Sequence, residues 1–91
     1  MQAEDLLQEA SEMLSERGAI YGKPEKNFSV IAELWSAYLG VPIRGADVAR
    51  LNALQKIARI IQTPSHKDSH LDAANYMALG YQLEVQDDRH D

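Results

Sequence analysis

The stretch that decides the fold is one in which apolar residues return every three or four positions. It reads Leu51-Asn52-Ala53-Leu54-Gln55-Lys56-Ile57-Ala58-Arg59-Ile60-Ile61. Positions three, four and seven apart share one face of a helix. The residues that form this apolar face are Leu51, Leu54, Ile57, Ala58 and Ile61. The pattern predicts a helix over 47–61, with Asp47 as its N-cap or first-turn acid.

The same periodicity recurs outward from this stretch. Residues 3–17, 25–39 and 69–85 each carry apolar side chains at helical spacing. Gly18 and Gly40 are predicted to end the first two of these helices, and Pro64 lies in the break before the last. No segment alternates with a period of two. The sequence therefore predicts an all-α fold of four helices.

The 91 residues suffice for a single domain, 1–91, in which about 84–91 read as a frayed acidic tail. A chain of this length buries only about 60–65% of the surface that its unfolded form exposes. The apolar faces of the four helices are wider than one such chain needs to cover its core. We therefore expect a homodimer or a larger homo-oligomer.

The amino-acid composition excludes some classes of function and argues against others. There is no cysteine, which excludes disulfides and thiolate metal sites. The formal net charge of −5 argues against binding extended nucleic acid, although a single nucleotide remains compatible with it. No apolar run reaches 18 residues, and the acidic N-terminus lacks the features of a secretion signal. We expect a cytoplasmic protein without a membrane partner.

Two polar stripes interrupt the apolar pattern. Lys56 and Arg59, with Asn52 one turn earlier, form one stripe. The second stripe consists of Asp68, Asp72, Asn75 and Tyr76. Two cations and two carboxylates on neighbouring helices suit a ligand that carries phosphates and a divalent metal ion. The alternative is that the cations are solvated or paired with acids of a neighbouring helix.

Asp68 and Asp72 are one turn apart and could share a metal ion such as Mg²⁺, which prefers oxygen ligands. The alternative is that Asp68 caps the helix and Asp72 is a first-turn acid. His66 and His70 have a spacing known from zinc sites, but Pro64 places His66 before the helix. A hydrogen bond from either histidine to a phosphate or a nearby carboxylate is therefore the preferred interpretation.

The turn that leads into the second helix supplies further polar groups. Glu25 and Asn27 could add ligands to the same pocket, and Tyr21 could stack on a base. Ordinary turn and capping roles are the alternative. Trp35 and Tyr38 are predicted to anchor the core or an interface.

These motifs, in this order, resemble a family of small phage and prophage proteins described as MazG-like, within the all-α nucleoside triphosphate pyrophosphohydrolases. The resemblance covers about 16–83. It rests on Arg17 followed by Tyr21-Gly22-Lys23-Pro24-Glu25-Lys26-Asn27-Phe28, the run Ile31-Ala32-Glu33-Leu34-Trp35-Ser36-Ala37-Tyr38-Leu39-Gly40, Asp47-Val48, Lys56-Ile57-Ala58-Arg59, and His66-Lys67-Asp68 followed by Asp72 and Tyr76. It implies a four-helix MazG-like bundle completed by homo-oligomerisation. It also implies cytoplasmic function in a phage-infected or prophage-carrying bacterium.

The resemblance implies Mg²⁺-dependent cleavage (Mn²⁺ being an alternative) of a nucleoside or deoxynucleoside triphosphate to the monophosphate and pyrophosphate. By position, Asp68, Asp72 and Glu25 would be the catalytic metal ligands. The substrate-binding residues would be Tyr21, Asn27, Lys56, Arg59, His66 and Tyr76. The second and third predicted helices lack the ExxE pair that MazG enzymes carry, and the pair Glu9 and Glu12, which has that spacing, lies on the first helix outside the resemblance. Two rival hypotheses therefore stand beside the enzyme: a protein that binds a nucleotide or nucleotide-derived signal without turning it over, and a helical interaction module.

Overall fold

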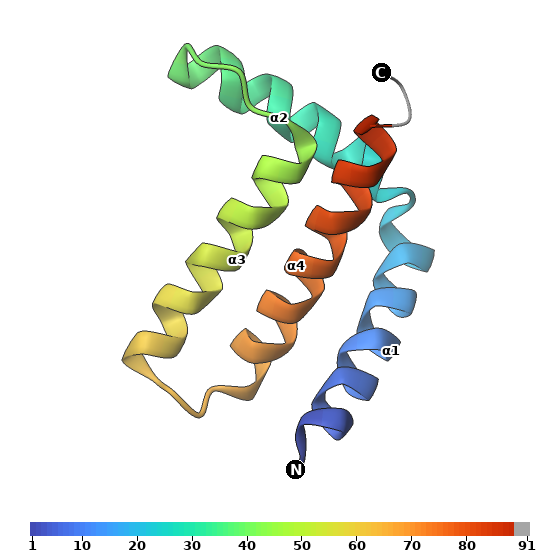
Figure 1. Ribbon diagram of the computed structural model, residues 1–91, viewed down its shortest axis with the longest axis vertical. Helices are drawn as coiled ribbons and strands as arrows, with labels where there is room; N and C mark the ends of the chain where they lie inside the picture. Colours follow the sequence, from blue (N-terminus) through green and yellow to red (C-terminus); the bar gives the residue numbers. More distant parts are fainter. Residues whose placement is uncertain (89–91) are drawn as a thin grey trace.

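A computed structural model describes residues 1–88 of the chain, and four α-helices account for nearly all of them (Figure 1). The helices are α1 (Ala3–Tyr21), α2 (Pro24–Leu39), α3 (Gly45–Gln62) and α4 (Lys67–Asp88). These described residues contain no strand, which confirms the prediction of an all-α fold with four helices. No helix among these residues has both the length and the apolar character needed to cross a bilayer.

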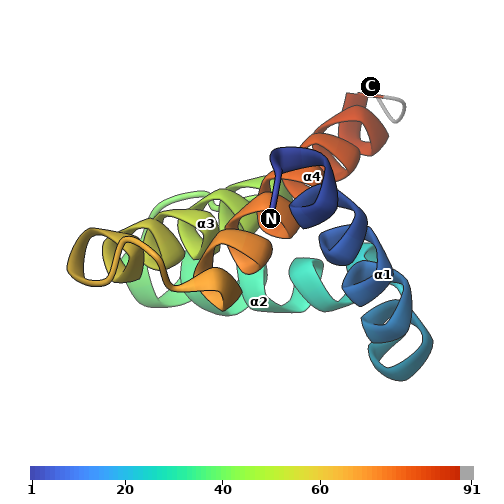
Figure 2. The ribbon, with the colours of Figure 1, turned by 90° about the horizontal axis from the view of Figure 1, so that it is seen from below.

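The α3 and α4 helices form an antiparallel hairpin, and α1 lies along the opposite side of α4 (Figures 1 and 2). Small side chains allow α3 and α4 to approach closely. Ala46, Ala49 and Ala53 are fully buried between them, and Gly80 of α4 faces this row. A Cβ atom built on Gly80 would lie 3.7 Å from the Cβ of Ala49, an ordinary van der Waals contact.

The α2 helix crosses one end of this hairpin (Figure 1). Phe28 and Ala32 of α2 are buried against Val48 of α3 and Leu83 of α4, with Trp35 packed at the edge of the cluster. Ser36 fixes the connection after α2, because its hydroxyl accepts a hydrogen bond of 2.8 Å from the backbone N–H of Ile43. The core is therefore small and lies where α2 meets the hairpin.

The predicted end of the first helix is wrong, whereas that of the second helix is correct. Gly18 does not end α1, which continues to Tyr21 and stops at Gly22 with φ +81°. The helix can continue through Gly18, because a glycine inside a helix costs only about 1 kcal/mol relative to alanine. The prediction for α2 is confirmed, since Gly40 adopts the left-handed conformation and its N–H donates to the carbonyl of Ser36.

The predicted frayed tail is wrong for residues 84–88, which extend α4 to Asp88. Glu84 holds this segment to α3, because its carboxylate accepts hydrogen bonds from Arg44 and, at 3.0 Å, from Nη2 of Arg50. Asp47 joins the same network and, as predicted, is a first-turn acid that accepts a hydrogen bond from the backbone N–H of Arg44. Residues 89–91 of the expected tail lie outside the described residues.

Many large apolar side chains lie on the surface rather than in the core. The exposed fraction is 65% for Leu34, 89% for Tyr38 and 58% for Leu54. Trp35 meets the expectation of a core anchor, whereas Tyr38 points to solvent. The buried set is dominated by alanines, together with Phe28 and a few aliphatic residues. The tertiary structure of one chain thus leaves many of its large apolar side chains exposed.

Candidate functional site

All four helices line one pocket of about 710 Å³, which we call the central pocket. Each helix contributes residues spaced three or four positions apart, so that one face of every helix meets the pocket. Its lining residues are Leu14, Arg17, Gly18, Tyr21, Gly22, Pro24, Asn27, Phe28, Ile31, Asn52, Lys56, Asp72, Asn75, Tyr76, Leu79 and Gln82. The pocket therefore depends on the packing of the whole fold and not on a single loop.

Three charged side chains meet in the central pocket. The Asp72 carboxylate lies between two cations, with Oδ1 3.3 Å from Nη1 of Arg17 and Oδ2 3.2 Å from Nζ of Lys56. The Arg17 contact is an ion pair without hydrogen-bond geometry, because Oδ1 has no hydrogen-bond partner within residues 1–88. Arg17 and Lys56 keep 46% and 35% of their side chains exposed, whereas Asp72 keeps 14%. Two accessible positive charges and one shielded negative charge give the pocket a net positive sign.

Asn75 is the second notable feature of the central pocket. The residue is only 6% exposed, and its Nδ2 has no hydrogen-bond partner in the described part of the chain. A buried donor without an acceptor costs about 1–3 kcal/mol. Such a group is therefore expected to have a role that offsets the cost, and an acceptor on a bound molecule would satisfy it.

Aromatic and aliphatic side chains complete the pocket wall. Tyr21, at the end of α1, is 69% exposed, and Tyr76 lies on α4 one turn after Asp72. Asn27 helps to fix the junction between α1 and α2, since its Nδ2 donates a hydrogen bond of 2.9 Å to the carbonyl of Tyr21. The pocket thus combines apolar walls with a small number of polar and charged groups, as ligand sites in proteins do.

The structure gathers five of the nine site residues that the sequence predicts. These five are Tyr21, Asn27, Lys56, Asp72 and Tyr76, and all of them line the central pocket. Four others do not line it: Glu25, Arg59, His66 and Asp68. The predicted phosphate-binding, aromatic and amide groups are thus brought together more fully than the predicted carboxylates.

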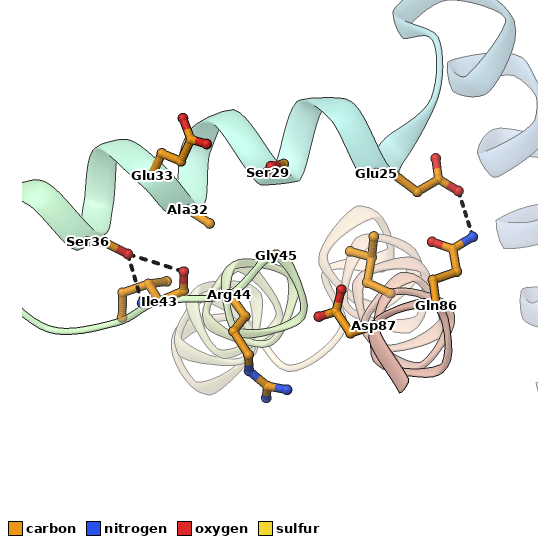
Figure 3. Close-up of a pocket in the computed structure, with 11 residues that line it drawn as sticks. Glu25, Ser29, Ala32, Glu33, Ser36, Ile43, Arg44, Gly45, Gln86 and Asp87 are labelled. Carbon is orange, nitrogen blue, oxygen red and sulfur yellow. Dashed lines mark hydrogen bonds between the residues drawn. The ribbon is translucent and has the colours of Figure 1, made fainter. Parts of the chain in front are cut away.

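Glu25 lines a different pocket, of about 560 Å³, between α2, the start of α3 and the end of α4 (Figure 3). We call it the acidic pocket, because its charged lining residues are Glu25, Glu33, Arg44 and Asp87. Arg44 directs its guanidinium away from the other labelled side chains in Figure 3 and binds Asp47 and Glu84 instead. Carboxylates therefore dominate this second pocket.

The Glu25 carboxylate is held by local hydrogen bonds. Its Oε1 accepts a bond of 2.7 Å from Nε2 of Gln86 and a longer one from Gln82, whereas its buried Oε2 has no partner among residues 1–88. A backbone hydrogen bond at Glu25 itself, followed by the Gln86 contact, lowers the pKa of this carboxyl. Glu25 is thus a first-turn acid of α2 stabilised in its charged form, consistent with the capping alternative.

The remaining predicted residues lie beyond the central pocket. His66 precedes α4, and its Nδ1 is 2.7 Å from the hydroxyl of the buried Ser69. Arg59 is exposed on α3, one turn beyond Lys56. Asp68 is exposed in the first turn of α4 as the second residue of the helix, whereas the capping alternative placed it at the N-cap. None of these three residues contributes to the central pocket, and His66 contacts Ser69 instead.

The predicted metal ligands are not gathered at one place within the chain. Glu25 lines the acidic pocket, Asp72 lines the central pocket, and Asp68 lines neither. Residues 1–88 contain no group of three or more His, Asp or Glu side chains placed to hold a metal ion. The three-carboxylate set therefore does not fit a Mg²⁺ ion as arranged in this chain, and Mg²⁺ binding stays a prediction.

Four pocket residues with polar or charged side chains were not among the predicted site residues: Arg17, Asn52, Asn75 and Gln82. Asn52 and Asn75 carried a usable signal, because each lies three or four positions from Lys56 or Asp72 on the same helical stripe. Arg17 opens the first run of the resemblance, but its spacing gave no sign that it would face Asp72. Its role depends on α1 packing beside α4, which places it next to a residue 55 positions later in the chain.

Comparison with known proteins assigns the chain to a family. Residues 5–84 match a family described as "Domain of unknown function (DUF6378)". The chain belongs to this family. No solved structure matches it.

Two relatives of this DUF6378 chain are phage proteins. It is 45% identical over 75 residues to the Gene 55 protein of Mycobacterium phage D29, a match that covers 81% of the chain and 50% of the relative. It is 34% identical over 85 residues to the Gene 55 protein of Mycobacterium phage L5, covering 91% of the chain and 54% of that relative. The chain therefore spans about half the length of the curated relatives it matches.

Proposed function

We propose that the central pocket binds a phosphorylated small molecule of the nucleotide class. The observation that carries the proposal is the reversal of charge at this pocket. The chain as a whole has a formal net charge of −5. The charged lining residues of the pocket are Arg17, Lys56 and Asp72, which sum to a positive charge. A cationic pocket in an acidic chain favours an anionic ligand.

Arg17 and Lys56 are suited to receive phosphate oxygens. Arginine offers a planar fork of donors and lysine a compact charge, and both bind phosphate through charge-assisted hydrogen bonds. Both side chains reach solvent, whereas Asp72 beneath them is largely shielded. A phosphate can therefore reach the two cations from the solvent side, while Asp72 stays shielded from it.

The neutral lining supports a ligand with an aromatic base and hydrogen-bonding edges. Tyr21 and Tyr76 offer ring faces, and Asn75 offers a buried donor that needs an acceptor. The volume of about 710 Å³ lies within the about 300–1,000 Å³ typical of small-molecule sites. Phosphates at Arg17 and Lys56, with a base toward the tyrosines, use all of these groups.

Hydrolysis is the second candidate, supported by the resemblance to MazG-like pyrophosphohydrolases and by Asp72 inside the pocket. It would convert a nucleoside triphosphate to the monophosphate and pyrophosphate with Mg²⁺ or Mn²⁺. The chain places one carboxylate in the pocket rather than three, which favours binding over turnover. On the MazG-like hypothesis the protein would act in the cytoplasm of a bacterium that carries the phage or prophage.

One titration series tests binding and hydrolysis together. Purified protein is titrated with nucleoside mono-, di- and triphosphates by calorimetry, with and without Mg²⁺, and the recovered nucleotides are resolved by ion-exchange chromatography. We expect saturable binding that weakens in Lys56→Gln and is unchanged in Lys26→Gln, whose exposed lysine lies outside the pocket. Metal-dependent release of pyrophosphate would favour the enzyme. Absence of binding to every nucleotide would refute the proposal.

A further inference from the structure

An uncharged apolar stripe runs along the surface of α3. It consists of Leu51, Leu54, Ile57, Ala58 and Ile61, and we call it the α3 stripe. The exposed fractions of its large side chains range from 42% for Leu51 to 76% for Ile61. It covers about 15 Å of the helix axis. A contiguous apolar surface of this kind marks an interaction site in a soluble protein.

The total surface of the chain shows that a large area is left to cover. The chain exposes 6549 Å², whereas a folded monomer of 91 residues exposes about 5,300 Å². The excess of about 1,200 Å² is larger than the about 800 Å² that each partner buries in a standard protein interface. This excess, summed over the whole chain, is large enough to include an interface of the size that a stable dimer needs.

The order of residues in the stripe indicates a second copy of the same helix as the partner. When two α3 helices run antiparallel about a two-fold axis level with Lys56, Leu51 faces Ile61 of the partner subunit. Leu54 then faces Ala58 of the partner subunit, a large side chain against a small one. Such self-complementarity is what a two-fold interface requires, because the same patch contributes both sides.

We propose that the chain forms a homodimer through antiparallel pairing of the α3 stripe. The two charged residues between 51 and 62, Lys56 and Arg59, lie more than a quarter turn from the centre of the stripe, so that like charges do not meet across the two-fold axis. Lys56 instead points into the central pocket, where it pairs with Asp72. Pocket and dimer interface thus use different faces of α3, and the proposal does not rest on ligand binding.

Light scattering after size exclusion tests the proposal with two matched substitutions. Leu54→Glu places a charge at the centre of the stripe, and Leu7→Glu places the same charge on α1. Leu54 and Leu7 are equally exposed, at 58% and 59%. We expect a dimer for the unmodified chain and for Leu7→Glu, and a monomer for Leu54→Glu. A monomeric unmodified chain, or a dimer that persists in Leu54→Glu, would overturn the proposal.

A cross-linking experiment keeps the test decisive if Leu54→Glu fails to fold. The chain has no cysteine, so that Leu54→Cys combined with Ala58→Cys creates the only thiols. Antiparallel pairing brings residue 54 next to residue 58 of the second copy, and mild oxidation should give a covalent dimer on a non-reducing gel. The control pair Leu7→Cys and Ser11→Cys on α1 should stay monomeric. Equal cross-linking in both pairs would contradict the assigned interface.

Discussion

The central pocket and the acidic pocket differ in charge far more than in size. The central pocket, of about 710 Å³, holds Arg17 and Lys56 around a shielded Asp72. The acidic pocket, of about 560 Å³, is lined by three carboxylates and by Arg44, whose guanidinium is bound to Asp47 and Glu84. By volume alone, the two pockets would be similar candidates for a small-molecule site. The accessible charge separates them and directs an anionic ligand to only one.

Removing the cations of the central pocket is the strongest way to break this comparison. We expect Arg17→Gln with Lys56→Gln to weaken nucleotide binding by roughly 100-fold or more, since each charge-assisted hydrogen bond contributes about 1.5–3 kcal/mol and about 1.4 kcal/mol is tenfold. Glutamine keeps a donor for Asp72, so that the fold survives. Calorimetric titration measures the loss, and Lys23→Gln with Lys26→Gln is the control. Equal losses in both double variants would indicate a general charge effect.

A substitution at Asn75 sharpens the comparison by separating binding from stability. Asn75→Leu removes a buried donor that has no partner within residues 1–88. We expect the free energy of unfolding to stay the same or rise, because the cost of the unpaired donor disappears. Nucleotide affinity should fall by roughly tenfold, the size of one lost hydrogen bond to a ligand.

Urea denaturation and calorimetry on the same Asn75→Leu sample give both quantities. Leu71→Ala on the same helix is the opposite control, because Leu71 is 1% exposed and lies outside the pocket lining. It should lose stability and keep its affinity at temperatures where it remains folded. If Asn75→Leu lost stability without losing affinity, Asn75 would have a structural role.

The acidic pocket gives the smallest effect, a dependence of stability on pH. The pKa of Glu25 is lowered by hydrogen bonding, and those of Asp47 and Glu84 are lowered chiefly by hydrogen bonds that involve Arg44. A lowered carboxyl pKa stabilises the fold above the unfolded value, 4.5 for Glu25, and this contribution is lost as the pH falls through the folded value. Stability should therefore decline as the pH falls below about 4.5.

Glu25→Gln tests this origin of the acid sensitivity. The substitution should change stability at pH 7 by less than about 0.5 kcal/mol, as most surface substitutions do. It should also flatten the decline of the urea midpoint between pH 5 and pH 3. Glu12→Gln, on the exposed face of α1, should leave the slope unchanged. If the urea midpoint declined equally with pH in the unmodified chain, Glu25→Gln and Glu12→Gln, the acid sensitivity would come from a group other than Glu25.

The helices could be predicted from sequence because each depends on local periodicity, and their number was correct. The ends were less accurate. Gly18 resembles a helix stop as much as Gly22 does, but only Gly22 takes the positive φ that requires glycine. The continuation of α4 past Glu84 depends on Arg44 and Arg50, residues more than 30 positions earlier. Contacts of this kind leave no local signal.

The site was predicted where residues share a helical face and missed where they do not. Lys56 and Asp72 were identified on two stripes, and α3 and α4 bring those stripes together. Glu25 and Asn27 were assigned to one pocket, yet residues two positions apart on a helix point in directions about 200° apart. They accordingly line different pockets. Asp68 is one turn from Asp72, and that turn is enough to place it beyond the pocket.

The row of alanines between α3 and α4 has a consequence for how such a chain can diverge. Ala46 and Ala49 are completely buried and Ala53 nearly so, opposite Gly80. Larger side chains there would wedge the hairpin apart and move Lys56 away from Asp72. Viable variation in this seam is therefore confined to the smallest residues. Substitutions in the pocket walls can change the ligand preference, while the buried alanines keep α3 and α4 close enough for Lys56 to contact Asp72.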